Sequence, residues 1–231
     1  MESLGTLFHE AKVDLPKQKV TIEFTRILDA TPKVIKILQR EHHSLWGHML
    51  WNAGKYLANY FDSFPELCKG KRVIEFGAGL ALPSMICHLQ GAKSVLCTDY
   101  PEDALLNNIR EIVESNKCDI RVKGYLWGTE INEKCDLLVL SDLVANHSQH
   151  DALIKSILQV LDSENPNAFA ICAFSHHRPH LKTKDMEFIE KAKDCLRVEF
   201  VETVEMEPMF PDDPGDLLVR SQVHCYKFFR K

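Results

Sequence analysis

The segment that most constrains the fold is residues 72–100, which read RVIEFGAGLALPSMICHLQGAKSVLCTDY. An apolar run leads into a Gly77-Ala78-Gly79 turn, and a helix-like stretch and a second apolar run then lead to Asp99. This order predicts a strand, a tight turn, a helix and a second strand that ends in a carboxylate. A βαβ unit of this kind holds an adenosine-containing ligand, because the glycines let it approach the backbone and the carboxylate accepts both ribose hydroxyls.

The residues around the two glycines distinguish between such ligands. A dinucleotide site continues to a third glycine, which would stand where this chain has Leu82. Glu75 lies just before the first glycine, and its carboxylate repels phosphate but favours a cation. S-adenosylmethionine carries an amino group and a sulfonium and no phosphate, so we favour it over NAD. The alternative is that Gly77 and Gly79 only form a tight turn and that Asp99 only ends a strand.

The alternation of helix and strand continues toward the C-terminus. Helices are predicted over 102–115, 148–161 and 184–195, and strands over 120–125, 135–140 and 168–174. Because these strands are near-continuous apolar runs, they predict a parallel sheet covered on both faces. Residues 198–206 and 217–229 read as strands with no helix between them, so they should pair antiparallel. The predicted fold is α/β, a doubly wound, mainly parallel seven-stranded Rossmann-like sheet with a C-terminal antiparallel hairpin.

The region before the glycine turn reads as a strand over 20–24, a short helix over 32–41 and an amphipathic helix over 48–61. We therefore divide the chain into an N-terminal extension over 1–45, which could be a lid over the substrate, and a single domain over 46–231. A chain of 231 residues with 45% hydrophobic residues is large enough for one such domain with a buried core.

Charge and composition exclude several classes of protein. The net charge of −5 comes without any basic run, so we expect no nucleic-acid interface. No apolar stretch could cross a bilayer and no signal peptide is evident, so we expect a cytoplasmic monomer without membrane contact. The eight cysteines are scattered and predict free thiols that are mostly buried, chiefly Cys87, Cys97, Cys135 and Cys172. No ligand spacing is typical of zinc, so we expect no metal.

Several blocks in this order resemble the class I, seven-β-strand S-adenosylmethionine-dependent methyltransferases over nearly the whole chain. The blocks are LWGHMLWNAG at 45–54, EFGAG at 75–79, TDYP at 98–101, GYLWG at 124–128 and DLVANHSQH at 142–150. More narrowly, the chain is similar to the nicotinamide N-methyltransferase-like branch, and within it to fungal-type enzymes that methylate the N-terminus and adjacent lysine of translation elongation factor 1-alpha. The resemblance implies S-adenosyl-L-methionine as cofactor and a protein amine as substrate.

At the cofactor, the resemblance implies that Glu75, Gly77 and Gly79 line its methionine part. Asp99 would bind the ribose, with Tyr100 beside it at the end of the same strand. These residues are also the ones that the glycine turn and the strand-end carboxylate single out on physical grounds.

Two tryptophans and a serine complete the implied cofactor pocket. Trp127 would face the adenine, Trp51 would lie against the methionine or sulfonium end, and Ser141 would close the pocket beside the reacting methyl. Many relatives carry Asp where this chain has Leu126, so backbone carbonyls would bind the adenine amino group here. Alternatively, both tryptophans are core aromatics, because an aromatic on a helix usually faces the core.

The amine acceptor would meet Asp142, Asn146 and His147. Asp142, beside Ser141, or Asn146 would align the amine through a hydrogen bond, and His147 would take up a proton directly or through water. Alternatively, Asp142 caps its strand, and Asn146 and His147 only begin the next helix. Five carboxylates over 205–216 would either attract a basic peptide or form a solvated loop.

Other functions stay open at this point. A nicotinamide-type methyltransferase of small amines would need a closed, aromatic-lined pocket. Substrates flipped from nucleic acid usually go with an Asn-Pro-Pro-Tyr-like element, which Ser141-Asp142-Leu143-Val144 lacks. A silent binding module would keep the fold without binding the cofactor. An NAD-dependent oxidoreductase is disfavoured by Leu82 and by the terminal hairpin.

Overall fold

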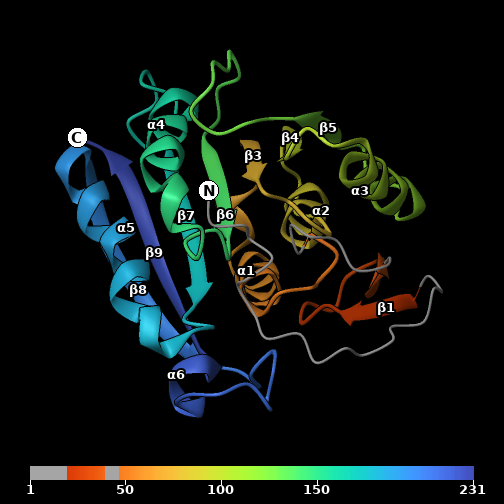
Figure 1. Ribbon diagram of the computed structural model, residues 1–231. Coiled ribbons are helices and arrows are strands. Elements are labelled where there is room, and N and C mark those ends of the chain that lie inside the picture. The colour runs from red at the N-terminus through yellow and green to blue at the C-terminus, as the bar shows by residue number, and fades with distance from the viewer. Residues whose placement is uncertain (1–19, 40–46) are drawn as a thin grey trace.

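The computed structural model describes residues 20–39 and 47–231 (Figure 1). Its centre is a seven-stranded sheet in the order β5-β4-β3-β6-β7-β9-β8. The strands are β3 (Arg72–Phe76), β4 (Ser94–Asp99), β5 (Arg121–Gly124), β6 (Leu137–Ser141), β7 (Phe169–Ser175), β8 (Leu196–Glu205) and β9 (Gln222–Arg230). β9 pairs antiparallel with β7 and β8, whereas the other neighbours are parallel. The predicted doubly wound sheet with a C-terminal antiparallel hairpin is confirmed.

Helices cover both faces of this sheet. They are α1 (Asn52–Ser63), α2 (Leu82–Leu89), α3 (Asp103–Ser115), α4 (His150–Val160) and α5 (Lys182–Cys195), with a short α6 (Leu217–Ser221) and single turns η2 (Pro65–Leu67), η3 (His147–Gln149) and η4 (Pro179–Leu181). Successive strand residues point to opposite faces, so Val73 belongs to the core under α1, α2 and α3, while Ile74 belongs to the core under α4 and α5.

The strand order places a crevice at one edge of the sheet. From β3 the chain passes through α2 to β4 on one side, and from β6 it passes through α4 to β7 on the other. In an open α/β sheet, ligands bind outside the carboxyl ends of the strands at the point where the order reverses. Here that point lies between β3 and β6, so the glycine turn after β3 and the loop after β6 face the same crevice.

Two strands precede this sheet and form a separate antiparallel hairpin (Figure 1, red), β1 (Val20–Thr25) with β2 (Val34–Gln39). The predicted helix over 32–41 is wrong in its described part. Ile35 and Ile37 are fully buried while Lys36 between them is exposed, and this period of two satisfies a strand and not a helix. The β-branched isoleucines also favour extended backbone.

Side-chain contacts attach the hairpin to α1 and α3. The guanidinium of Arg26 lies 2.8 Å from the carboxylate of Asp62 in α1, and both side chains are buried. The side chain of Asn116, after α3, accepts from the N–H of Lys36 and donates to its carbonyl. This part of the predicted 1–45 extension packs against α1 and the residue that follows α3. The lid hypothesis for the remainder, and the boundary at residue 45, fall on residues 1–19 and 40–46, outside the described residues.

One predicted helix and one predicted strand begin later than the sequence pattern indicates. The helix predicted over 48–61 begins at Asn52. Residues 217–229 were expected to be all strand, but the first five of them form α6. The cause is Asp216, whose side chain accepts from the N–H groups of Leu218 and Val219 and so caps the new helix. The pairing of β8 with β9 is antiparallel as predicted.

The remaining sequence expectations concern the thiols, metals and membranes. All eight cysteines are free, and all but Cys195 are buried, including the four singled out above. Over the described ranges, no group of three or more His, Cys, Asp or Glu side chains is placed to hold a metal ion. Among the helices of residues 20–39 and 47–231, none combines the length and the apolar character needed to cross a bilayer.

Candidate active site

The turn between β3 and α2 brings its backbone close to two neighbouring loops at the carboxyl edge of the sheet. Gly77 and Gly79 have φ angles of +56° and +53°, in the left-handed region that favours glycine. A Cβ atom on Gly77 would lie 2.6 Å from Cδ2 of Leu143, and one on Gly79 would lie 3.4 Å from the carbonyl oxygen of Gly47. A side chain at Gly77 would thus displace the loop that follows β6.

Asp99 connects the end of β4 to this turn. The N–H of Gly79 donates to its Oδ2 at 2.8 Å, and the N–H of Tyr100 donates to its Oδ1 at 2.7 Å. Each oxygen of a carboxylate has two lone pairs, so both oxygens can accept a further hydrogen bond from a ribose hydroxyl. Tyr100 is about half exposed at the mouth of the crevice, with 49% of its surface accessible.

Glu75 is a buried carboxylate beside the turn, 1% exposed. The N–H and the hydroxyl of Ser84, in the first turn of α2, both donate to its Oε2 at 3.1 and 2.5 Å. Its other oxygen, Oε1, has no hydrogen-bond partner within the described part of the chain. Burial raises the pKa of Glu75 to about 8, and the nearby charge of Asp99 acts in the same direction. A cation beside Oε1 would stabilise the ionised carboxylate, which burial disfavours.

Asp142 joins three elements at the end of β6. Its φ angle is +54°, which is strained for a residue other than glycine. Oδ1 accepts from the N–H of Ser175 at 3.0 Å and from Nε2 of His177 at 3.1 Å, and Oδ2 accepts from the N–H of Ala53 at 3.4 Å. The side chain, 4% exposed, therefore connects β6 to the end of β7 and to the first turn of α1.

Trp51 immediately precedes α1 and lies over this junction. Its ring centroid is 4.8 Å from that of His177 and 6.0 Å from that of Phe210, in the loop after β8. Both partners come from loops at the carboxyl edge of the sheet. Trp51 therefore lies at the carboxyl edge of the sheet.

Comparison with known proteins agrees with this geometry. The lysine methyltransferase family matches residues 30–195. The chain belongs to this family. The protein N-terminal and lysine N-methyltransferase of Schizosaccharomyces pombe is 41% identical over 92% of this chain and 89% of its own length. The enzyme of the same name from Candida albicans is 36% identical over 96% of this chain and 94% of its own length.

Solved structures of low sequence identity share the fold of this lysine methyltransferase. SMU.776, solved in complex with SAH, superposes with a TM-score of 0.59 at 13% identity and covers 93% of this chain and 57% of its own. The YcgJ protein of Bacillus superposes with a TM-score of 0.61 at 8% identity and covers 76% of this chain and 98% of its own. Membership of the methyltransferase family makes S-adenosylmethionine the cofactor.

The residues present fit this cofactor. The buried, unpartnered Oε1 of Glu75 suits an ammonium group. The Asp99 carboxylate, at the carboxyl end of the neighbouring strand, is of the type that accepts ribose hydroxyls. A dinucleotide would instead bring phosphate toward the Glu75 carboxyl. When bound, S-adenosylmethionine supplies a methyl group on a positively charged sulfur, which is an activated leaving group.

The predicted adenine loop follows β5 in the lysine methyltransferase. Trp127 is partly buried and packs against the core under α4 and α5, so part of its ring is a core aromatic as the alternative stated. The N–H of Gly128 donates to the hydroxyl of Ser156 in α4 at 2.8 Å, and Lys155 donates to the Gly128 carbonyl. Leu126 is exposed at this loop. These contacts hold the loop after β5 against α4.

Asn146 and His147 lie in the loop after β6, where the chain enters η3. Nε2 of His147 is 2.6 Å from Oδ1 of Asp185 in α5, and Nδ1 of His176 is 2.7 Å from the other oxygen of the same carboxylate. The side chain of Asn146 accepts from the hydroxyl of Ser148. His147 is partly exposed, so a buried carboxylate orients an imidazole that still reaches the surface.

The loop after β8 contacts the start of α1 at the carboxyl edge of the sheet. The side chain of Asn52 donates to the carbonyl of Glu207 at 2.6 Å. A hollow of about 410 Å³ lies beside this bond and is lined by Asn52, Lys55, Met206, Glu207, Pro208 and Met209. Burial lowers the pKa of Lys55 at this hollow. The acidic loop is thus on the active-site edge, as its place after a parallel-running strand predicted.

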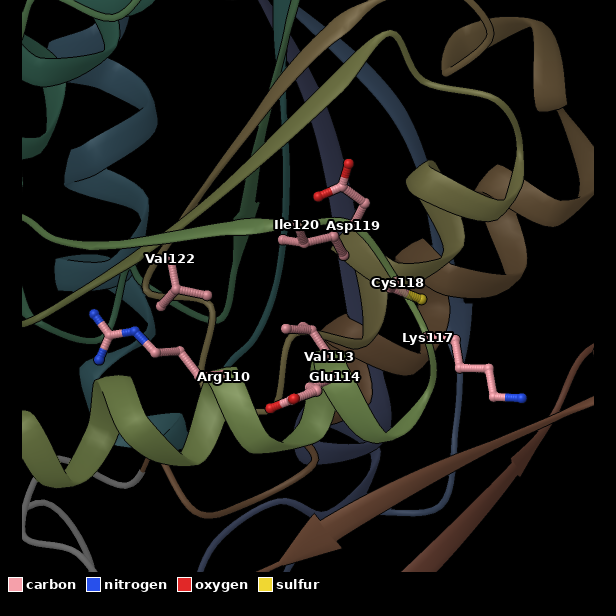
Figure 2. A pocket seen from close by; sticks show the side chains of 8 residues that line it. All are labelled: Arg110, Val113, Glu114, Lys117, Cys118, Asp119, Ile120 and Val122. Atoms are coloured by element: carbon pink, nitrogen blue, oxygen red, sulfur yellow. The ribbon is translucent and has the colours of Figure 1, made fainter.

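A second hollow, of about 440 Å³, lies between α3 and β5. Figure 2 shows the side chains of Arg110, Val113, Glu114 and Lys117 on α3 and the turn after it, below those of Ile120 and Val122. The segment entering β5 lies at the amino edge of the sheet, opposite the glycine turn. We assign this hollow no part in methyl transfer.

Sequence reasoning did not identify the residues that complete the acceptor side. His177, Asp185 and Phe210 contact the predicted residues Asp142, His147 and Trp51. The available signal for His177 was its place just after a buried strand that runs parallel, where site residues collect. Ser141 is close to α1, since a Cβ on Gly54 would lie 3.4 Å from its hydroxyl.

Proposed function

We propose that this lysine methyltransferase methylates the N-terminal amine, a nearby lysine, or both, of translation elongation factor 1-alpha. The observation that supports this most is the 41% identity, over 92% of the chain, to an enzyme named for both N-terminal and lysine methylation. The elongation factor itself rests on the resemblance of the sequence blocks described above. We further propose that the enzyme is a cytoplasmic monomer, in keeping with its eight free thiols.

The chemistry favours an N-terminal amine as the easier acceptor. The acceptor nitrogen must be neutral to attack a methyl group. An α-amino group has an ordinary pKa near 8 and is partly neutral at physiological pH, whereas the ordinary pKa of lysine is about 10.4. A lysine must therefore lose its proton by desolvation or to a base at the site.

We assign the cofactor to the glycine turn and its neighbours. Glu75, Gly77 and Gly79 would hold the methionine part, and Asp99, with Tyr100 at the rim, would hold the ribose. The unpartnered Oε1 of Glu75 and the two strand-end hydrogen bonds of Asp99 support this assignment.

The adenine and the reacting end of the cofactor lie, in this proposal, at opposite ends of the crevice. Trp127 would face the adenine from the loop after β5. Trp51 and Ser141 would close the pocket beside the methyl group, where the start of α1 meets the end of β6. The short separation between Gly54 and the Ser141 hydroxyl supports this pairing.

We assign acceptor roles to the loop after β6. Asp142 and Asn146 would align the amine through hydrogen bonds, and His147 would take up its proton. The contact between His147 and Asp185 supports the role of base, because a carboxylate on one ring nitrogen orients the other. In a His147→Ala variant, turnover should fall most near neutral pH, where the amine carries its proton and an imidazole can still accept it. His180→Ala, on an exposed residue of η4, is the control, and an unchanged pH profile for His147→Ala would remove His147 from this role.

The substrate assignment can be tested with cell extract. Extract from cells that lack this activity is incubated with the enzyme and labelled S-adenosylmethionine, and the labelled protein is identified by mass spectrometry. We expect label on elongation factor 1-alpha, at its N-terminal amine, at a nearby lysine or at both. Unlabelled elongation factor 1-alpha beside another labelled protein would overturn the substrate and leave the reaction class standing.

A further inference from the structure

We propose that His177 is a positioning residue for methyl transfer, which fixes the Trp51 ring and the Asp142 carboxylate relative to each other on the acceptor side of the crevice. This inference rests on the proposed transfer to a protein amine. His177 lies in the loop after β7 and is 8% exposed. His177 lies outside the sequence blocks that carry the family resemblance.

His177 forms a hydrogen bond with Asp142. Nε2 of His177 lies 3.1 Å from Oδ1 of Asp142, and because a carboxylate only accepts hydrogen bonds, His177 is the donor. Asp142 has a left-handed backbone, a conformation that a residue with a Cβ seldom adopts. The three donors that converge on its side chain hold it in that conformation.

The His177 ring also contacts the ring of Trp51. The two rings lie 4.8 Å apart at an angle of 59°, within the range of favourable aromatic contacts. The backbone near Trp51 is attached to the same carboxylate, since the N–H of Ala53 donates to Oδ2 of Asp142. Asp142 therefore holds Trp51 twice, through the first turn of α1 and through the His177 ring.

His177 and Asp142 lie on the side of the crevice that we assign to the acceptor, and Trp51 lies between that side and the reacting end of the cofactor. His177 follows β7 and Asp142 follows β6, whereas the residues assigned to the methionine part and the ribose follow β3 and β4. Phe210, from the acidic loop, meets the edge of Trp51 on the same side. A displaced acceptor loses rate steeply, because in-line transfer depends on the approach of the amine. Loss of His177 should thus reduce turnover much more than cofactor affinity.

Three variants separate the two contacts. His177→Gln keeps an N–H donor without a ring, His177→Phe keeps a ring without the donor, and His177→Ala lacks both. His180→Ala is the matched control on an exposed histidine nearby. Each protein is checked by thermal melting, its affinity for S-adenosylhomocysteine is measured by calorimetry, and kcat and KM are measured on elongation factor 1-alpha from cells lacking the activity.

We expect His177→Ala to lower kcat/KM about tenfold, mainly through kcat, with cofactor affinity within about twofold of the unchanged enzyme. At least one of His177→Gln and His177→Phe should keep most of the kcat/KM that His177→Ala loses. If His177→Ala does not fold, these two variants are compared directly with the wild-type enzyme. The proposal is overturned if all folded variants keep full kcat/KM, if the loss follows cofactor affinity, or if neither variant restores it. An unchanged enzyme that leaves the elongation factor unmethylated contradicts the proposed function instead.

Discussion

The two sides of the crevice are built in different ways. The side that we propose for the cofactor is formed by backbone groups and two carboxylates within residues 72–100, at the turn of Gly77 and Gly79 and in the contacts of Glu75 and Asp99. On the acceptor side, side chains from several loops meet at Asp142. A local pattern can specify the first kind of site, whereas the second exists only once the sheet has formed.

The residues that contact each other are closer in sequence on the cofactor side of the crevice than on the acceptor side. Glu75 and Ser84 are 9 residues apart, and Asp99 and Gly79 are 20 apart. Asp142 is 35 residues from His177 and 89 from Ala53. Contacts of the second kind require long chain segments to be ordered first. We therefore expect substitutions on the cofactor side to act on binding and those on the acceptor side to act on turnover.

The largest effect should come from Asp99→Ala. This change removes the acceptor of two backbone N–H groups and of the ribose hydroxyls. Two hydrogen bonds to a charged group, at about 1.5 kcal/mol each, correspond to a loss of about 100-fold in affinity. Calorimetry with S-adenosylhomocysteine measures it, with Asp119→Ala, on an exposed residue at the amino edge, as the control. Equal affinities would mean that the ribose lies elsewhere.

Asp142→Asn should show the opposite pattern. Asparagine tolerates the left-handed backbone, but its amide cannot serve both the Ala53 N–H and the two donors at Oδ1. We expect kcat/KM for the protein substrate to fall about tenfold, with cofactor affinity within about twofold. Steady-state kinetics measure kcat/KM and calorimetry on the same sample measures the affinity for S-adenosylhomocysteine. A loss of cofactor affinity as large as that of Asp99→Ala would contradict this expectation.

Glu75→Gln tests whether the buried carboxyl binds a cation. Because its pKa in the folded protein is about 8, Glu75 is mostly protonated at neutral pH and should release its proton when an ammonium group binds beside it. Calorimetry in buffers of different ionisation enthalpy should show this release, and Glu75→Gln should abolish it and weaken binding about fivefold, a loss of about 1 kcal/mol. Identical heats in all buffers for the unchanged enzyme would contradict the assignment.

The same shift gives a pH dependence of stability without cofactor. The folded pKa of about 8 lies above the ordinary value of 4.5, so the folded state binds the proton more tightly than the unfolded chain does. This contribution is fully present below the unfolded pKa and is lost as the pH rises through about 8. In thermal melts from about pH 5 to about pH 8.5, the unchanged protein should lose more stability than Glu75→Gln. Melting temperatures that change in parallel with pH for the two proteins would contradict a raised pKa for Glu75.

The smallest effect concerns the acidic loop. Neutralising the exposed residues Glu205, Glu207 and Asp212 should raise the KM for a basic protein substrate about threefold at low salt, and added salt should remove the difference. Neutralising Glu114 and Asp119, at the hollow of Figure 2, is the matched control. An unchanged KM would show that the loop is only a solvated surface.

Much of the fold followed from local patterns, and the failures have physical causes. β6 and β7 are almost wholly buried, so their apolar runs could only be core strands. The helix predicted over 32–41 is wrong in its described part because β2 forms by pairing with β1, a contact that exists only in the folded chain. α6 depends on the cap at Asp216. His177 escaped notice because its role depends on Asp142 and Trp51, which lie on other loops.

A crystal structure of the enzyme with S-adenosylhomocysteine tests the central claim most directly. We predict density with the amino acid part beside Gly77 and Glu75, the ribose on Asp99 and the sulfur directed toward Trp51 and Asp142. A ligand bound outside the glycine turn, or a crevice that stays empty at saturating ligand, would contradict the account.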